Sequence, residues 1–183
     1  MEQRSDLELA LADLDRANAV IGEHVSQDWL PIRSDWFSAR SFYFQLIQDR
    51  DEMVEASWQA WLIANEMNDF GRKVNTLHNL GKAYYETGQY AQALAYLDQC
   101  EQLCGEVCHR RIYSLCHKTI GACHYFLNDR VLALQHYQVA YQGFSEMNQA
   151  HWLAGVCYDL AEVLAESGDW RNAYEALAAE NRK

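Results

Sequence analysis

Cysteine and histidine, the residues of this chain best suited to metal or redox chemistry, concentrate in one segment: Cys100, Cys104, Cys108, His109, Cys116, His117, Cys123 and His124. Zinc is bound by thiolates and imidazoles, often from cysteines a few residues apart. The first three cysteines, however, follow at steps of four, the spacing of one helix face. Cys100 also takes the place of the small residues Ala60 and Ala140, forty residues away on either side. We therefore predict small buried side chains and no metal, with a metal- or redox-responsive sensor as the alternative.

No pattern typical of catalysis accompanies these residues. The sequence has no serine, histidine and aspartate in an order that indicates a triad, and no glycine-rich phosphate loop. The acidic residues are scattered, as on a solvated surface, rather than paired as in an acid–base site. We predict a non-catalytic protein that needs no cofactor.

Helices must position these side chains. A single proline and nine glycines among 183 residues, 50% of them hydrophobic, favour long helices over β-sheets. A formal net charge of −11 disfavours binding to phosphate backbones, so we predict no nucleic-acid partner. The charge is uneven, with a net −5 over residues 1–28, +2 over 72–118 and −6 over 146–180. The basic middle is suited to attract an acidic peptide, although an ordinary mixed surface would look the same.

The sequence carries no sign of export or membrane insertion. It does not begin with a basic segment followed by an apolar core, and it has no apolar run of the ~18 residues that span a bilayer. Six cysteines in such a chain indicate reduced thiols rather than a disulfide framework. We expect a cytoplasmic protein without membrane contact.

A pattern recurs every forty residues. Segments 80–94, 120–134 and 160–174 each begin with Leu or Ile followed by Gly or Ala, then have Gly or Asn, and then Ala at the same relative places. The triplet Glu-Met-Asn at 66–68 returns at 146–148. Each unit predicts two helices joined by a tight turn, with Gly or Asn at the left-handed helix end and a small residue where helices cross.

The elements Leu80-Gly81-x-x-Tyr84, Gly88-x-Tyr90 and Ala93-Leu94 closely match the tetratricopeptide repeat, which the chain resembles over about residues 74–183. The resemblance implies an all-α fold, a right-handed superhelix of about three and a half antiparallel helix pairs. The forty-residue spacing exceeds the usual 34 and resembles variants of bacterial signalling proteins. We expect an array over 34–183, with a degraded repeat at 34–70 and clearer repeats at 74–106, 114–146 and 154–183.

The segment before the array predicts an extra helix and a linker. Ser5 and the following residues form a capping box that opens an amphipathic helix, so residues 1–28 are expected to form a cap or a dimerisation helix. Residues 27–33 are the expected linker, and Ser34 is the expected N-cap of the next helix. The last residues stop inside a helical pattern, from which we expect a longer protein.

In tetratricopeptide domains the first helices of the pairs line a concave groove. The resemblance assigns groove-lining roles to eleven positions: Asn75, His78, Asn79, Lys82, Tyr85, Lys118, Thr119, Tyr125, Tyr158, Asp159 and Glu162. Four of these positions partly resemble the carboxylate-binding version of the family: Asn75, Asn79, Lys82 and Lys118. Asp159 and Glu162 depart from it.

We predict a scaffold that binds a protein or peptide, as the N-terminal regulatory module of a larger bacterial signalling protein such as a diguanylate cyclase or a transcriptional regulator. The partner is expected to be acidic. The alternative is a homodimerisation module built on the leucines of residues 7–21.

Overall fold

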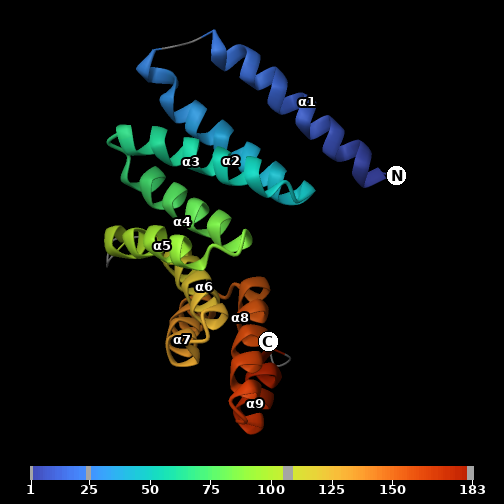
Figure 1. Ribbon diagram of the computed structural model, residues 1–183, viewed down its shortest axis with the longest axis vertical. Helices are drawn as coiled ribbons and strands as arrows, with labels where there is room; N and C mark the ends of the chain where they lie inside the picture. Colours follow the sequence, from blue (N-terminus) through green and yellow to red (C-terminus); the bar gives the residue numbers. More distant parts are fainter. Residues whose placement is uncertain (1, 24–25, 105–108, 181–183) are drawn as a thin grey trace. The chain divides into compact units, whose positions relative to one another are not determined.

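The computed structural model describes residues 2–23, 26–104 and 109–180, and these residues are helical nearly throughout (Figure 1). They fall into two compact units, residues 1–87 and 88–183, which are described separately. Unit 1 contains α1 (Glu2–Gly22), the short 3₁₀ helix η1 (Gln27–Trp29), α2 (Leu30–Ile47), α3 (Arg50–Glu66) and α4 (Phe70–Glu86). Unit 2 contains α5 (Tyr90–Cys104), α6 (Arg110–Phe126), α7 (Arg130–Glu146), α8 (Ala150–Glu166) and α9 (Trp170–Glu180).

The helices from α2 onward begin at residues 30, 50, 70, 90, 110, 130, 150 and 170, one every twenty residues. Two successive helices therefore make the forty-residue period, and the predicted all-α fold of repeated helix pairs is confirmed. The first helix of each pair begins four residues before the repeat boundary expected from the sequence, at 30, 70, 110 and 150 instead of 34, 74, 114 and 154.

The turns inside the pairs show why the period holds. A residue with positive φ ends the first helix at Gln48 (61°), Gly88 (78°), Asn128 (67°) and Gly168 (79°), which are forty residues apart. Glycine and, less readily, asparagine adopt this left-handed conformation at low cost, so the pattern predicted the turns at Gly88, Asn128 and Gly168 correctly, whereas Gln48 adopts it without that advantage. Where the residue after the left-handed one is aspartate, its side chain caps the second helix of the pair. The side chain of Asp129, for example, accepts a hydrogen bond from the amide of Leu132 at 3.1 Å.

Small residues lie where the helices cross. A Cβ atom added to Gly121 on α6 would lie 2.8 Å from the Tyr137 ring and 3.2 Å from the carbonyl oxygen of Ala133, both on α7. The position forty residues later is Ala161, which is also buried. Around the crossing, Phe144, Val156 and neighbouring apolar side chains form a buried cluster in unit 2. The sequence-based expectation of a close approach at Gly121 is thus confirmed.

The start of α2 differs from the expectation. The helix begins at Leu30 with Pro31 in its first turn, so the predicted linker 27–33 is wrong and Ser34 is not an N-cap. Proline is well tolerated in the first turn because its missing N–H has no partner there anyway. Ser34 is instead buried, and its hydroxyl donates to the carbonyl oxygen of Ala60 on α3 at 3.1 Å.

Ser41 takes the place in α2 that Gly81 and Gly121 have in later pairs. It is buried, its Oγ lies 2.6 Å from the Oγ of Ser57 on α3, and it donates to the carbonyl oxygen of Met53 at 3.1 Å. A serine can replace glycine here because its hydroxyl finds partners on the facing helix. The degraded repeat is therefore a true helix pair.

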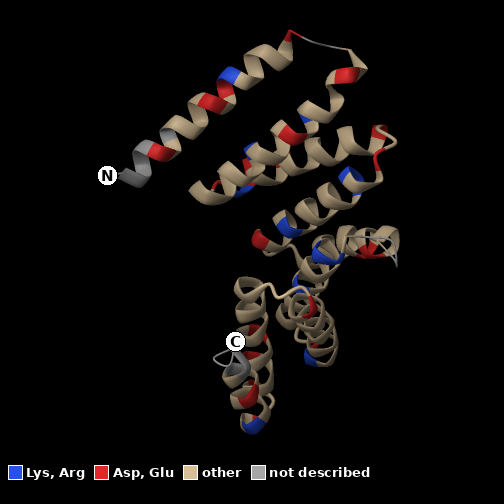
Figure 2. Ribbon diagram, turned by 180° about the vertical axis from the view of Figure 1, so that it is seen from behind, with Lys and Arg blue, Asp and Glu red and all other residues tan. Residues whose placement is uncertain are grey.

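Helix α1 packs on α2. The indole Nε1 of Trp36 donates to the carbonyl oxygen of Leu14 at 2.9 Å, and Ile21 is buried. The helix begins at Glu2, so the predicted start at the Ser5 capping box is wrong. Part of the predicted apolar face is therefore used inside unit 1, which favours the capping interpretation. Acidic residues are spaced along α1 (Figure 2).

Candidate functional site

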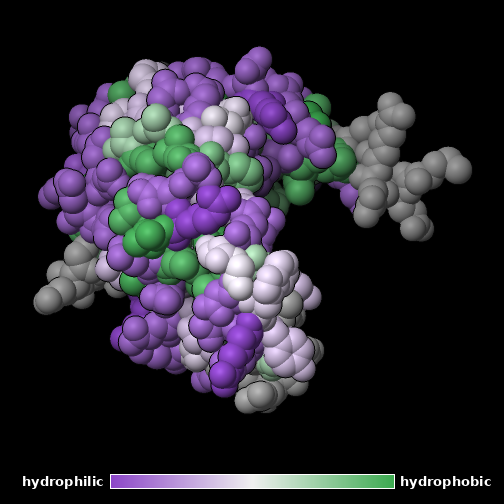
Figure 3. Space-filling view, turned by 60° about the horizontal axis from the view of Figure 1, so that its bottom comes forward, coloured by the Kyte–Doolittle hydropathy of each residue, from purple (hydrophilic) through white to green (hydrophobic). Residues whose placement is uncertain are grey.

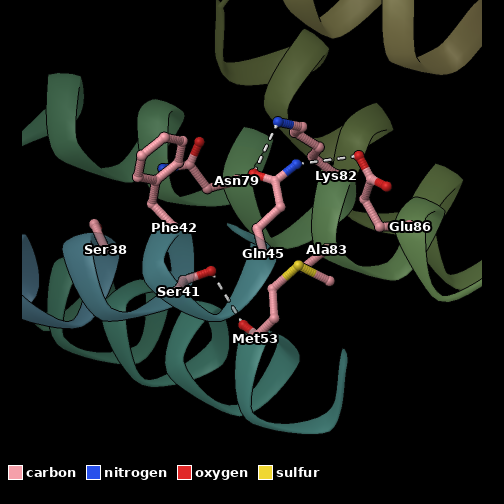
Figure 4. A pocket seen from close by; sticks show the side chains of 9 residues that line it. All are labelled: Ser38, Ser41, Phe42, Gln45, Met53, Asn79, Lys82, Ala83 and Glu86. Carbon is pink, nitrogen blue, oxygen red and sulfur yellow. Dashed lines mark hydrogen bonds between the residues drawn. The ribbon is translucent and has the colours of Figure 1, made fainter. Parts of the chain in front are cut away.

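A hollow of about 110 Å³ opens in unit 1 between the first helices of two successive pairs, α2 and α4 (Figure 4). We call it the α2–α4 hollow. Its lining residues come from α2, α3 and α4: Ser38, Ser41, Phe42, Gln45, Met53, Asn79, Lys82, Ala83 and Glu86. Stacked first helices make the open side of a repeat array, so this hollow lies where the family's groove was expected.

Three polar side chains point toward one another at one end of the hollow (Figure 4). The ammonium Nζ of Lys82 donates to Oε1 of Gln45 at 3.3 Å, and Nε2 of Gln45 donates to Oε1 of Glu86 at 3.2 Å. These bonds run between α2 and α4 and hold the two helices in register. They also fix the direction of the Gln45 amide, because its oxygen faces the cation and its nitrogen faces the carboxylate.

The opposite part of the hollow offers an apolar contact. Phe42 exposes 60% of its surface, whereas Met53 below it is buried. A largely exposed phenylalanine beside amide and ammonium groups gives a mixed surface that can contact both an apolar side chain and polar main-chain groups. The arrangement is suited to binding and has no nucleophile paired with a base.

The hollow contains two of the predicted groove residues, Asn79 and Lys82. Asn75 is exposed and Tyr85 is half-buried on the same helix, but neither lines the hollow. His78 is only 5% exposed, so its assignment to the groove is wrong. It lies one residue before Asn79, with Nδ1 3.4 Å from Oδ1 of that amide, and its ring turns toward the core.

Sequence reasoning missed Ser38, Phe42 and Gln45 of α2. The signal that would have found them is the forty-residue register itself, because these positions correspond to His78, Lys82 and Tyr85. The register is hard to detect in α2 because the Leu-Gly element that marks it in later repeats is absent there. Figure 4 shows that both helices contribute to the same hollow.

In unit 2 the predicted residues of α6 and α8 pair with each other. Nζ of Lys118 lies 3.1 Å from Oδ2 of Asp159, with both side chains about 30% exposed. Its positive charge is thereby balanced, so Lys118 is a weaker attraction for an acidic partner than the sequence indicated. Thr119 donates its hydroxyl to the carbonyl oxygen of Leu115 in its own helix, at 3.0 Å.

Tyr125 has a carboxylate partner that the sequence did not indicate. Its hydroxyl donates to Oε1 of Glu166 at 2.8 Å, and Nη2 of Arg130 donates to the other carboxylate oxygen at 2.8 Å. The hydrogen bond to Glu166 is the main cause that raises the pKa of Tyr125 to about 12. The same bond, together with Arg130, lowers the pKa of Glu166. Tyr158 and Glu162 of α8 are exposed.

The cysteine and histidine segment gives no support for a metal centre. Among the residues that the structure describes, no group of three or more histidine, cysteine or acidic side chains could hold a metal ion, and Cys108 lies outside those residues. The thiols of Cys100, Cys116, Cys123 and Cys157 are buried, as predicted for small core side chains. Cys104 is also buried.

Comparison with known proteins identifies the repeat. Residues 73–146 match the sequence model of the tetratricopeptide repeat. Residues 73–146 are tetratricopeptide repeats. No curated protein sequence matches it.

Solved structures share the fold at low sequence identity. The apo form of RapI superimposes with a TM-score of 0.83 at 17% identity, covering 97% of this chain and 64% of that one. A Rap protein complexed with Competence and Sporulation Factor superimposes with a TM-score of 0.80 at 17% identity, covering 97% of this chain and 51% of that one. A putative kinesin light chain from Podosopora anserina with nearly identical tetratricopeptide-like repeats superimposes with a TM-score of 0.77 at 14% identity. The match covers 98% of this chain and 87% of that one. The chain therefore spans less than two thirds of the two Rap proteins.

None of the helices in the described part of the chain combines the length and the hydrophobicity needed to cross a membrane. Apolar side chains reach the surface drawn in Figure 3 in separate patches with hydrophilic side chains between them.

Proposed function

We propose that this tetratricopeptide repeat domain is a non-catalytic scaffold that binds a peptide segment of a partner protein in the α2–α4 hollow. The observation that carries the proposal is the placement of an exposed aromatic ring, Phe42, beside the Asn79 amide and the Lys82 ammonium in one hollow between two first helices. The complex of a Rap protein with Competence and Sporulation Factor, which has a similar fold, supports this class of function.

The chemistry of the hollow indicates what kind of segment it takes. An extended peptide has unpaired main-chain N–H and C=O groups, and the amide of Asn79 can pair with one of each. Phe42 is suited to cover an apolar side chain of the peptide. Lys82 favours an acidic residue or a carboxylate next to it, because its ammonium group is positively charged and lines the hollow. We therefore propose an acidic segment with one apolar anchor.

The test is a selection of peptides from a random library, followed by measurement of dissociation constants by fluorescence anisotropy. Lys82→Glu is expected to weaken the selected acidic peptides at least about tenfold, or about 1.4 kcal/mol. Lys73→Glu is the matched control, since it makes the same charge change on α4 and Lys73 lies outside the hollow. Phe42→Ala is expected to weaken binding as well, and Leu46→Ala, also exposed on α2, is its control.

The proposal fails if no peptide is enriched, or if both lysine variants bind the selected peptides equally well. Equal binding by Phe42→Ala and Leu46→Ala would remove the apolar anchor from the proposal and leave only a general attraction of charge. Circular dichroism of each variant verifies that the helices are intact, so that a loss of binding reports on the hollow.

We also propose that the scaffold serves as the regulatory module of a cytoplasmic bacterial signalling protein. The likeness to the two Rap proteins supports this context. Cross-linking in the native host, followed by mass spectrometry, tests it by identifying what the chain contacts. Recovery of cross-links between copies of this chain alone would favour the homodimerisation module instead.

A further inference from the structure

Three histidines from α6 and α7 form a cluster inside unit 2. Nδ1 of His117 lies 2.8 Å from Nδ1 of His136, and the two rings stack with centroids 5.0 Å apart. On its other side His136 stacks on His124, with centroids 5.6 Å apart. His117 is the innermost of the three, with 3% of its surface exposed. The ring of Tyr113 packs edge-on against it, with ring centroids 4.3 Å apart. Neither the peptide-binding proposal nor the repeat pattern uses this cluster.

The facing nitrogens must share one proton, because a hydrogen bond of 2.8 Å needs one donor and one acceptor. The other ring nitrogen of His117, Nε2, lies 3.5 Å from Oε1 of Glu101 on α5. A proton on Nε2 faces that oxygen favourably, whereas a bare nitrogen would face it with a second lone pair. We assign the proton of neutral His117 to Nε2, so that His136 donates from Nδ1 and His117 accepts.

We propose that the His117–His136 pair is an acid-sensitive lock between α6 and α7, which holds while His117 stays neutral and opens when it takes up a proton. A first additional proton can go to Nε2 of His136 and leaves the hydrogen bond intact. A second must go to Nδ1 of His117 and places two N–H groups against each other at 2.8 Å. The two rings must then separate, and α6 and α7, which carry them, must move apart as well.

The groups around the cluster oppose proton uptake by His117. His117 faces Glu101 of α5, Tyr113 of its own helix and His136 of α7. His136 is influenced in turn by Asp98 of α5 and His124 of α6. Burial, followed by His136, lowers the pKa of His117 to about 4. Burial and His124 also lower the pKa of His136, partly offset by Asp98. Burial and Asp98 raise the pKa of Glu101, which weakens the negative charge that could otherwise stabilise a protonated His117.

The direction of the pH effect follows from these pKa values. The unfolded chain takes up a proton on His117 near its ordinary pKa of 6.5, whereas the folded unit does so only near 4. Well above pH 6.5 His117 is neutral in both the folded and the unfolded state, so the folded state loses no stability through this residue. As the pH falls below 6.5 the unfolded state binds more protons, so the folded state loses stability until the pH reaches about 4. At pH 5.5 the loss from His117 alone is about tenfold in the folding equilibrium constant.

The test compares urea unfolding of the full chain at pH 7.5 and pH 5.5 in the wild type and two variants. His117→Phe keeps a flat ring beside Tyr113 but cannot titrate. His151→Gln removes an exposed histidine of α8 and is the matched control. We expect the folding equilibrium constant to fall at least about tenfold in the wild type and in His151→Gln, and markedly less in His117→Phe.

A second measurement does not depend on the folding of a variant. Proton NMR of the histidine Cε1–H signals in the wild type is expected to show His117 titrating well below its ordinary pKa of 6.5. The lock is refuted if His117 titrates near pH 6.5, or if His117→Phe folds and keeps the full pH dependence. If His117→Phe does not fold, the NMR titration alone decides.

Discussion

A methyl group added at Gly121 tests whether the close crossing of α6 and α7 stabilises unit 2. The new Cβ would lie 2.8 and 2.9 Å from Cδ1 and Cε1 of Tyr137, and 3.2 Å from the carbonyl oxygen of Ala133. Carbon atoms in contact prefer about 3.5–4.0 Å, so the ring or the helix must move by about 0.6–1 Å. Tyr137 is only 3% exposed and has little room to move. Overpacking of this kind costs about 1–3 kcal/mol.

Gly155→Ala on α8 is the matched control for Gly121→Ala. A Cβ at Gly155 would meet only the flexible end of Lys118, at 3.6 and 3.8 Å, which is ordinary contact. Both substitutions replace glycine by alanine inside a helix, and each gains about 1 kcal/mol of helix propensity. That gain cancels when the two variants are compared, so the difference between them isolates the strain at the crossing.

The assay is urea unfolding followed by circular dichroism, with the free energy of unfolding taken from the midpoint and slope. We expect Gly155→Ala to be as stable as the wild type or more stable, and Gly121→Ala to be less stable than Gly155→Ala by about 1–3 kcal/mol. Equal free energies of unfolding for the two variants would refute the reasoning, because they would mean that the helices are not held together at Gly121.

Three further predictions concern unit 2. Phe144→Ala removes a side chain with no exposed surface from the core cluster and should destabilise the protein by about 3–5 kcal/mol, measured by urea unfolding; a loss below 1 kcal/mol would contradict the packing. Glu166→Gln removes the charged acceptor of Tyr125, so ultraviolet titration should show one tyrosine ionising closer to pH 10 than to its present value of about 12; an unchanged curve would contradict the hydrogen bond. Thiol titration without denaturant should be slow, since the hydrogen bond with Cys100 and burial raise the pKa of Cys116, and burial raises the pKa of Cys123. Fast labelling would contradict the burial of these four residues: Cys100, Cys116, Cys123 and Cys157.

The sequence by itself determined the repeat. Gly88, Asn128 and Gly168 mark the ends of first helices because a left-handed residue is a local requirement of the backbone, and local requirements are visible in single residues. The forty-residue spacing and the small residue at Gly121 follow in the same way, from what one position can accommodate. The resemblance to the tetratricopeptide repeat assigned Asn79 and Lys82 to the groove, and both line the hollow.

The N-terminal repeat shows where local patterns fail. A proline followed by a serine predicts a linker and a cap, but Pro31 lies in the first turn of α2 and the hydroxyl of Ser34 reaches α3. The serine had two possible partners, the amides of its own helix and a carbonyl of another, and only the position of the second helix selects between them. Sequence spacing carries no information on that position.

Only the tertiary structure decided which polar side chains face each other. The pairs Lys118–Asp159 and Tyr125–Glu166 lie about forty residues apart in sequence, and the His117–His136 pair joins two helices across a turn. Each depends on the rotation of both helices about their axes and on their separation to within an ångström or so, which packing sets. His78 turns toward the core for the same reason. A periodic sequence fixes which face of a helix a residue occupies, whereas the partner across the interface is fixed by how two faces meet.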